Sequence, residues 1–396
     1  MISRKVVLYI LSISAIVGCR EEFDPKVSDY EELLVVDGFV TNEQGPYTVK
    51  LSLTSSLEEP DLNPLSGCRV MLEEKDGQYE VLKEKEPGTY KSSAGGFQAS
   101  AGESYKLTIE TPGGQLYHSD FIEMKQPVAI DTSTVKLRFR ESPEYPEPLG
   151  AYHFFVSTRE AEQNNTFFLW RISETYEYTS EFRILYIYRG MGVEAFYNRD
   201  SLYRCWKTQN VKEFFVGTTQ GLTTPRIRKE PIHVVTTEGK RLQVRYSWQI
   251  KQYNISREAY EFWKEVRNQT AGDDFLFSTQ PYQLRGNVYN VNNPEEAVMG
   301  FFTVGSVTRK RFFVDRPDAR FYYQKCVPNP DLRALMFMPP EQYPVYLTNT
   351  NEGRAFASDY CFDCTLWGGQ LEPPEFWVEH KTSKNTRTEK IKKDKN

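Results

Sequence analysis

Leu242–Ile250, which reads LQVRYSWQI, is the stretch that decides the fold of this 396-residue chain. Its apolar side chains recur at every second position, at Leu242, Val244, Tyr246 and Trp248. Because successive side chains of a strand point to opposite faces, this alternation predicts a strand with one buried face. Aromatic residues make up 14% of the chain, and they pack well on pleated surfaces. We therefore expect a mainly β protein.

One prominent helix is expected directly after this strand, near residues 256–271. Ser256 suits its N-cap, and apolar residues follow at the helical spacing i, i+3, i+4 and i+7. This stripe consists of Ala259, Phe262, Trp263 and Val266. It predicts a helix that lies on a sheet, with Phe262 and Trp263 as anchors. The alternative is that these two side chains form an exposed face that binds a partner.

Two domains are the natural expectation for this length. Short alternating segments predict an immunoglobulin-like β-sandwich over residues 31–126. The polar segment Lys125–Asp131, which contains a proline, marks the boundary, and residues 127–380 are expected to form a larger β-rich domain that carries the helix. Besides the opening stretch, strands of this domain are expected at 135–139, 152–157, 167–172, 182–188, 286–291 and 298–304.

The chain begins with the features of a secretory signal. Arg4 and Lys5 precede an apolar run, and the acidic Glu21 and Glu22 end that run too early for a permanent membrane span. We expect a lipoprotein signal peptide over residues 1–18.

Cys19 is the expected site of lipidation. A small residue directly before it, with aliphatic residues farther ahead, resembles the bacterial lipobox. Lipidation at Cys19 would hold the protein on a membrane, since two or more acyl chains anchor stably. An ordinary signal peptide followed by an incidental cysteine is the alternative.

The residues after Cys19 bear on which membrane face the protein occupies. Arg20, Glu21 and Glu22 resemble the short acidic signal that sends Bacteroidetes lipoproteins to the cell surface. Residues 19–30 are expected to form a lipidated tether, and the alternative for the acidic residues is a solvated tether without a signal. The expected location is the outer membrane, at the cell surface.

The charge pattern excludes a nucleic-acid partner. Lys and Arg number 49 against 54 Asp and Glu, a formal net charge of -5, so no broad basic field is expected. Residues 381–396 are rich in Lys and Arg and are expected to be a disordered, solvated tail. Contact of this tail with phosphate-bearing lipopolysaccharide is the alternative.

Four cysteines are candidates for disulfides. Cys68 alternates with apolar residues and is expected to pack as a small hydrophobe rather than react. An even set in an exported protein predicts two disulfides, with three possible connectivities. A zinc site built on the closely spaced pair is the competing idea. The four candidates are Cys205, Cys326, Cys361 and Cys364.

Catalytic and cofactor patterns are sparse. The four histidines are isolated in sequence, and His118, Ser119 and Asp120 are adjacent residues of an expected strand that point to alternate faces. We therefore expect no catalytic residues, no metal and no cofactor.

The order of several motifs resembles the uncharacterised Bacteroidetes family called domain of unknown function 4249. The motifs include Leu34-Val35-Val36-Asp37-Gly38, Tyr246-Ser247-Trp248, Gly286-Asn287-Val288, Gly300-Phe301-Phe302 and Cys361-Phe362-Asp363-Cys364. The resemblance implies a lipoprotein of the kind often encoded beside TonB-dependent outer-membrane receptors. It supplies no catalytic residues.

The expected function is therefore binding, as a non-catalytic accessory subunit of a TonB-dependent receptor in nutrient uptake, with the ligand left open. Two alternatives remain, a structural envelope or adhesion lipoprotein and a surface hydrolase whose site is assembled from distant residues.

Overall fold

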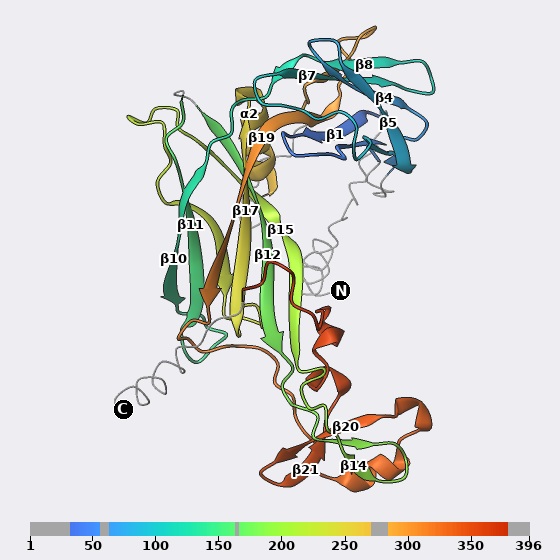
Figure 1. Ribbon diagram of the computed structural model, residues 1–396, viewed down its shortest axis with the longest axis vertical. Helices are drawn as coiled ribbons and strands as arrows, with labels where there is room; N and C mark the ends of the chain where they lie inside the picture. The colour runs from blue at the N-terminus through green and yellow to red at the C-terminus, as the bar shows by residue number, and fades with distance from the viewer. Residues whose placement is uncertain (1–31, 56–62, 163–165, 271–283, 379–396) are drawn as a thin grey trace, which may run out of the picture.

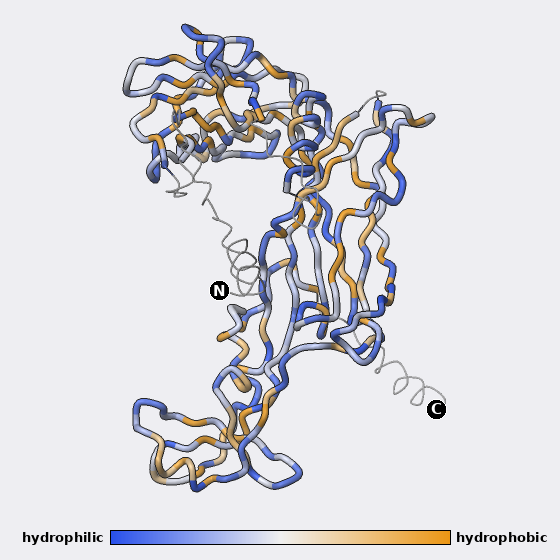
Figure 2. The backbone as a smooth tube through the Cα atoms, turned by 180° about the vertical axis from the view of Figure 1, so that it is seen from behind, coloured by the Kyte–Doolittle hydropathy of each residue, from blue (hydrophilic) through white to orange (hydrophobic). Residues whose placement is uncertain are grey.

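The computed structural model describes residues 32–55, 63–162, 166–270 and 284–378, and these form three units that follow one another along the long axis of the molecule (Figure 1). The expected mainly β fold with one prominent helix is confirmed. Apolar stretches run along the strands, and polar stretches dominate the loops, as Figure 2 shows. The alternation that predicted strands from the sequence is thus the pattern that buries their inner faces.

The N-terminal unit is one continuous series of hydrogen-bonded strands that encloses a single core. Their order is β1-β2-β6-β5-β4-β7-β8-β18, which leaves the more specific immunoglobulin topology a prediction. In β2, Val49 and Leu51 are buried and Lys50 is exposed, as the period of two requires. The strands are β1 (Leu34–Val40), β2 (Thr48–Leu53), β3 (Asn63–Pro64), β4 (Arg69–Glu74), β5 (Tyr79–Glu86), β6 (Thr89–Lys91), β7 (Ser104–Glu110), β8 (Leu116–Ser119), β9 (Ile122–Glu123) and β18 (Val288–Asn290).

Strand β19 (Met299–Asp315) joins the N-terminal unit to the next one. Its first part pairs in parallel with β1, from Val35 opposite Met299 to Val40 opposite Val304. Its second part pairs antiparallel with β17 (Arg245–Ile255). One strand therefore belongs to both sheets.

The middle unit is a sandwich of two sheets. The sheet β15-β12-β17-β19 packs against the three-stranded sheet β10-β11-β16. Phe154 of β11 lies 4.5 Å from Trp248 of β17 between ring centroids, and both side chains are fully buried. The additional strands are β10 (Ile130–Arg140), β11 (Leu149–Thr158), β12 (Phe167–Thr179), β15 (Arg204–Thr218) and β16 (Glu230–Thr236).

Helix α2 (Arg257–Thr270) lies on the other face of the four-stranded sheet, and the prediction of this helix is confirmed. Ser256 caps it, since the Ser256 hydroxyl accepts a hydrogen bond of 3.1 Å from the Ala259 amide.

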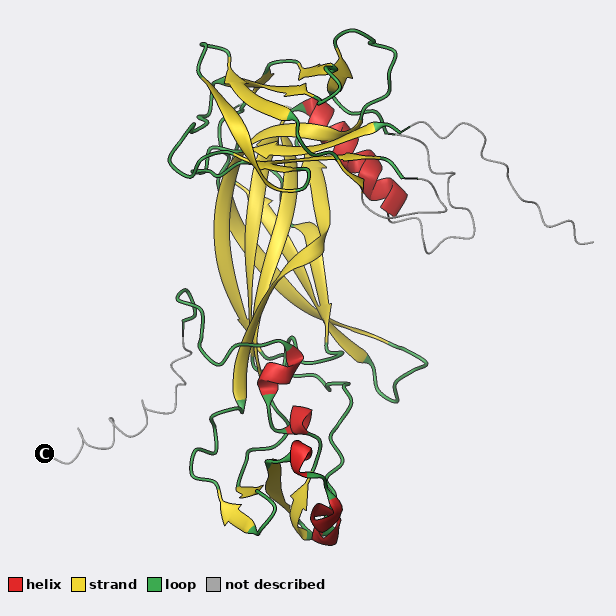
Figure 3. Ribbon diagram, turned by 90° about the vertical axis from the view of Figure 1, so that its right-hand side faces the viewer, coloured by secondary structure: helices red, strands yellow, loops and turns green. Residues whose placement is uncertain are grey.

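The lower unit is a small sheet with short 3-10 helices beside it, as Figure 3 shows. Two disulfides stabilise it. Its sequence comes from two separate segments, near residues 182–202 and 326–367. The elements are β13 (Tyr186–Tyr188), β14 (Val193–Ala195), β20 (Val345–Thr350), β21 (Gly353–Phe356), η2 (Leu332–Phe337), η3 (Pro340–Gln342), η4 (Asp359–Cys361) and η5 (Cys364–Trp367).

Several strand boundaries differ from those expected. The opening stretch begins its strand at Arg245 rather than Leu242, the expected strand at 182–188 is limited to Tyr186–Tyr188, and the strand at 298–304 continues to Asp315. Strands β15 and β16 were not expected at all. In β15 the alternation is interrupted, because its pairing with β12 shifts register between Arg171 and Ser173.

Candidate functional site

The expected lipidation and export residues, Cys19, Arg20, Glu21 and Glu22, lie outside the described residues, as does the basic tail at 381–396. Their roles stay predictions. Within the part of the chain that the structure describes, no helix is both long and apolar enough to cross a membrane.

The four candidate cysteines form two disulfides, one of the three possible connectivities. Cys205 at the start of β15 is bonded to Cys364, and Cys326 is bonded to Cys361. The competing zinc site is therefore wrong, because bonded sulfurs leave no thiolate to bind a metal. The described residues contain no other group of three metal-ligating side chains.

The remaining singled-out side chains lie in cores or contacts within the chain. Cys68 is a buried free thiol, as expected. The aromatic ring of Phe262 lies 4.7 Å from that of Phe301 on β19, and Trp263 donates a hydrogen bond to the Thr303 hydroxyl. The structure thus places both partner-face candidates in the contact between helix and sheet.

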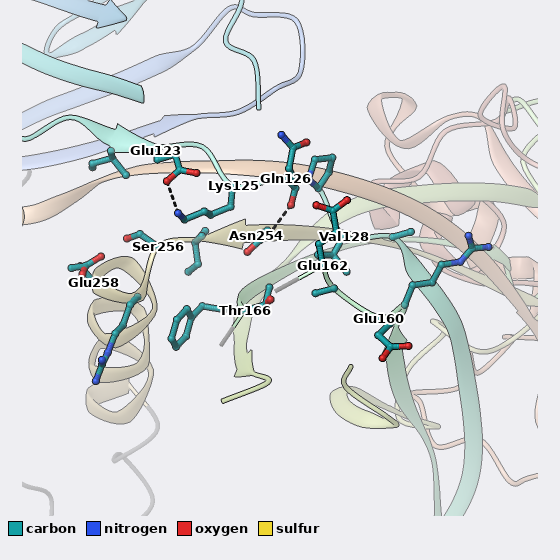
Figure 4. A pocket seen from close by; sticks show the side chains of 18 of the residues that line it. Glu123, Lys125, Gln126, Val128, Glu160, Glu162, Thr166, Asn254, Ser256 and Glu258 are labelled. Atoms are coloured by element: carbon teal, nitrogen blue, oxygen red, sulfur yellow. Dashed lines mark hydrogen bonds and ion pairs between the residues drawn. The ribbon is translucent and has the colours of Figure 1, made fainter. Parts of the chain in front are cut away.

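A pocket of about 820 Å³ lies at the junction of the N-terminal and middle units (Figure 4). We call it the junction pocket. Three segments form most of it: the linker after β9, the loop after β11, and the end of β17 with the first turn of α2. Its lining includes residues 120–123, 125–129, 159–162, 166–167, 254–258 and Asn287.

Hydrogen bonds fix the linker that forms one wall. The Asn254 amide nitrogen donates to the Gln126 carbonyl oxygen at 2.8 Å, as Figure 4 shows. The buried Gln252 side chain donates to the Val128 carbonyl oxygen at 2.7 Å, and the Thr308 hydroxyl donates to the same oxygen at 2.9 Å. Side chains of β17 and β19 therefore hold the linker against the middle unit.

The lining combines apolar surface with charges of both signs. Phe167 and Ile255 contribute buried apolar side chains, whereas the charged residues other than the half-buried Lys125 are exposed. The Lys125 ammonium pairs with the Glu123 carboxylate at 2.6 Å, and the guanidinium groups of Arg159 and Arg257 have no ion-pair partner among the described residues. Such a lining can hold a small polar ligand by contacts to opposite charges and to an apolar wall.

The junction pocket is lined by carboxylates of the kind that a hydrolase uses, but no histidine is among its described lining residues. The carboxylates are those of Asp120, Glu123, Glu160, Glu162 and Glu258. His118 lies on β8, and the hydroxyl of Ser119 accepts a hydrogen bond from the Leu107 amide within the core. The two side chains point to opposite faces, as strand geometry requires.

A second titratable cluster lies inside the middle unit, around Glu174. Its carboxylate accepts a hydrogen bond of 2.6 Å from the Tyr246 hydroxyl, and His233 Nε2 lies 3.0 Å from the same hydroxyl. Glu174 is 1% exposed and His233 is 9% exposed. Because solvent scarcely reaches these groups, the cluster is suited to hold the two sheets together rather than to act on a ligand.

The sequence analysis singled out two segments that line the junction pocket, but it did not predict that they lie close together. The segment Lys125–Asp131 was expected as a boundary, and Ser256 as the beginning of a helix. Their proximity depends on the pairing of β17 with β12 and β19, which no local pattern reveals. The loop at 159–162 carried no signal that we recognised.

A family model with the description Domain of unknown function (DUF4249) matches residues 20–311 of the chain. No curated protein matches the chain.

Proposed function

This chain belongs to the DUF4249 family, and we propose that it is a binding lipoprotein without catalytic activity that serves a TonB-dependent receptor of the outer membrane. In this proposal Cys19 anchors the protein at the cell surface, and the protein captures a small nutrient and delivers it to the receptor. The observation that carries the proposal is the junction pocket.

The size and lining of the junction pocket support the binding of a small molecule. Ligand pockets usually have volumes of roughly 300–1,000 Å³. The junction pocket has about 820 Å³ and the apolar walls of Phe167 and Ile255. It also lies between two units, which is a common position for such sites.

The lower unit supports the involvement of a protein partner. Met191, Tyr197, Val327 and Phe337 are almost fully exposed, although all four side chains are large and apolar. They belong to the end of the molecule that lies opposite the N-terminal unit in Figure 1. Large apolar side chains gathered on one small unit are typical of a surface that a partner covers.

Capture of the tagged protein from gently solubilised membranes tests the partner. We expect a TonB-dependent receptor in near-equal amount with the natural chain, and strongly reduced receptor with the variant Met191→Ser/Phe337→Ser. The matched control is Tyr79→Ser, which removes an exposed aromatic side chain from the N-terminal unit. Recovery of the chain without any outer-membrane receptor would contradict the proposal.

A thermal-shift panel tests the junction pocket separately. Amino acids, short peptides, monosaccharides and disaccharides are added to the full chain, and we expect at least one class to raise the Tm. The variant Ala129→Trp places a large side chain at an exposed position of the lining and should abolish the shift. A shift that survives this substitution would place the binding elsewhere.

A further inference from the structure

The four-stranded sheet of the middle unit carries a group of cations on the face away from the sandwich core. Arg171 lies opposite Lys251, and Lys251 lies opposite Arg309, on the adjacent strands β12, β17 and β19. Neighbouring strands are about 4.8 Å apart, so these three positions form a row roughly 10 Å long. Arg311 lies two residues farther along β19, on the same face. We call these four residues the basic strip.

The basic strip lies between two covered parts of the same face. On one side, Leu169, Tyr253 and Val307 are buried in the cluster that also includes α2. On the other side, the C-terminal segment returns over the sheet, where the Arg311 guanidinium stacks on the Phe376 ring at 3.5 Å. The strip is thus a bounded part of the sheet with covered surface on each side.

Within the described residues, only one of the four cations has a carboxylate partner. Arg309 pairs with Glu43, which follows β1. Arg171 instead contacts the aromatic rings of Phe39 and Trp263, at 5.7 and 5.3 Å from their centroids. Arg311 donates a hydrogen bond to the Ser247 hydroxyl. No ion pair joins Lys251 to a described carboxylate.

This arrangement opposes the stability of the sheet. Like charges directly opposite one another on adjacent strands repel and destabilise the pairing. Burial lowers the pKa of the Lys251 ammonium, and the nearby charges of Arg309 and Arg171 lower it further, against the opposing effect of Glu43. A local arrangement that works against the fold is the kind of feature expected at a functional site.

We propose that the basic strip binds a phosphorylated carbohydrate. The phosphate group would lie on the row Arg171, Lys251 and Arg309, whose combined charge matches a dianion better than a single carboxylate. The planar guanidinium groups of the arginines suit paired hydrogen bonds to phosphate oxygens. The half-buried ring of Trp263 and the exposed ring of Phe376, one on each side of the strip, offer apolar surface for a sugar ring. None of these residues lines the junction pocket, so the inference stands apart from the proposed function.

Calorimetric titration of the full chain at low ionic strength tests the site with glucose 6-phosphate as the probe. We expect binding of glucose 6-phosphate, weaker binding of inorganic phosphate and none of glucose. The variant Lys251→Gln/Arg309→Gln should lower the affinity at least about tenfold, because two of the charge-assisted contacts are lost. The matched control Lys83→Gln/Lys91→Gln removes two charges from the N-terminal unit and should leave the affinity unchanged.

Three outcomes would overturn the proposal. The first is the absence of binding, or binding that the Lys251→Gln/Arg309→Gln variant does not reduce. The second is equal affinity for phosphate and glucose 6-phosphate, which would remove the role of the carbohydrate. The third is an equal loss of affinity in the control Lys83→Gln/Lys91→Gln, which would make the effect one of overall charge rather than of the strip.

The stability of Lys251→Gln without ligand gives an independent readout. If the strip serves binding rather than stability, removal of the Lys251 charge should relieve its repulsion with Arg171 and Arg309 and raise the Tm at low ionic strength. Added salt should reduce the difference in Tm between the variant and the natural chain. A lower Tm would mean that Lys251 stabilises the fold, and the proposal would fall.

Discussion

Glu174 shows how a single buried charge is accommodated in the core of the middle unit. Burial alone would raise the pKa of its carboxyl group, but the contacts with His233 and Tyr246 and the charge of Arg241 outweigh this effect. Together with a hydrogen bond from Gln209 they lower the pKa of Glu174 to about 2. The ionised carboxylate therefore joins β12 to β15, β16 and β17.

The pH dependence of stability should report this carboxylate. Its folded pKa lies below the unfolded value of about 4.3, so its contribution is present above that pH and is lost as the pH falls toward 2. We expect Glu174→Gln to lower the free energy of unfolding by roughly 3 kcal/mol at pH 7 and to flatten its decline in acid. Urea unfolding between pH 7 and 2.5 measures both effects. The control is the exposed Glu86→Gln, and identical acid slopes for Glu174→Gln and the natural chain would contradict the assignment.

Two glycine motifs have a physical reason at the scale of single residues. Gly300 has a φ of +78°, and a Cβ atom there would collide with the carbonyl group of Val36 on β1. A Cβ atom at Gly286 would in turn meet the carbonyl oxygen of Gly300. The neighbouring Asn287 side chain donates to the Phe302 carbonyl oxygen and accepts from the Phe302 amide, both at 2.8 Å. The glycines in these motifs let neighbouring backbone segments approach closely, and no ligand is needed to explain them.

At the scale of elements, the sequence predicts the helices and strands whose own apolar residues recur at a regular spacing. The alternation of Tyr246 and Trp248 predicted β17, and the stripe of Phe262 and Trp263 predicted α2. The same stripe could not show whether the sheet or a partner protein covers these two rings. An apolar pattern predicts that a side chain is buried, but it does not predict which surface buries it. Strand β15 was missed because its register shift places polar residues where alternation would demand apolar ones.

The disulfide between Cys205 and Cys364 should determine how firmly the lower unit is attached. It joins the start of β15 to η5 across 159 residues of sequence. We expect Cys205→Ala/Cys364→Ala to destabilise this unit by about 2–5 kcal/mol, because the long loop is no longer closed. Limited proteolysis with mass spectrometry should show faster cleavage within residues 326–367. The control Cys68→Ala removes a buried thiol from another unit. Unchanged cleavage within residues 326–367 of the double variant would refute this expectation.

At the scale of the whole molecule, the least predictable feature is that the chain returns to its first unit. The predicted boundary near residue 126 follows from local composition, and the junction pocket does lie at this linker. Val288, Val298, Phe302 and Val304, however, belong to the core cluster of the N-terminal unit. Contacts between residues far apart in the sequence leave no local pattern, so the basic strip and the junction pocket both required the register of β17 and β19.

The shared strand β19 predicts that the N-terminal unit does not fold without the later part of the chain. A fragment of residues 31–126 lacks four core side chains and leaves unpaired the edges of β1 and β8 that β19 and β18 cover. Open edges and a depleted core should leave this fragment unfolded. We therefore expect poorly dispersed amide signals in its NMR spectrum. Joining residues 284–306 to it through a Gly-Ser linker should restore dispersion, because these residues supply both strands. A well-dispersed spectrum of residues 31–126 alone would instead show that β19 is an attachment to a unit that is complete without it.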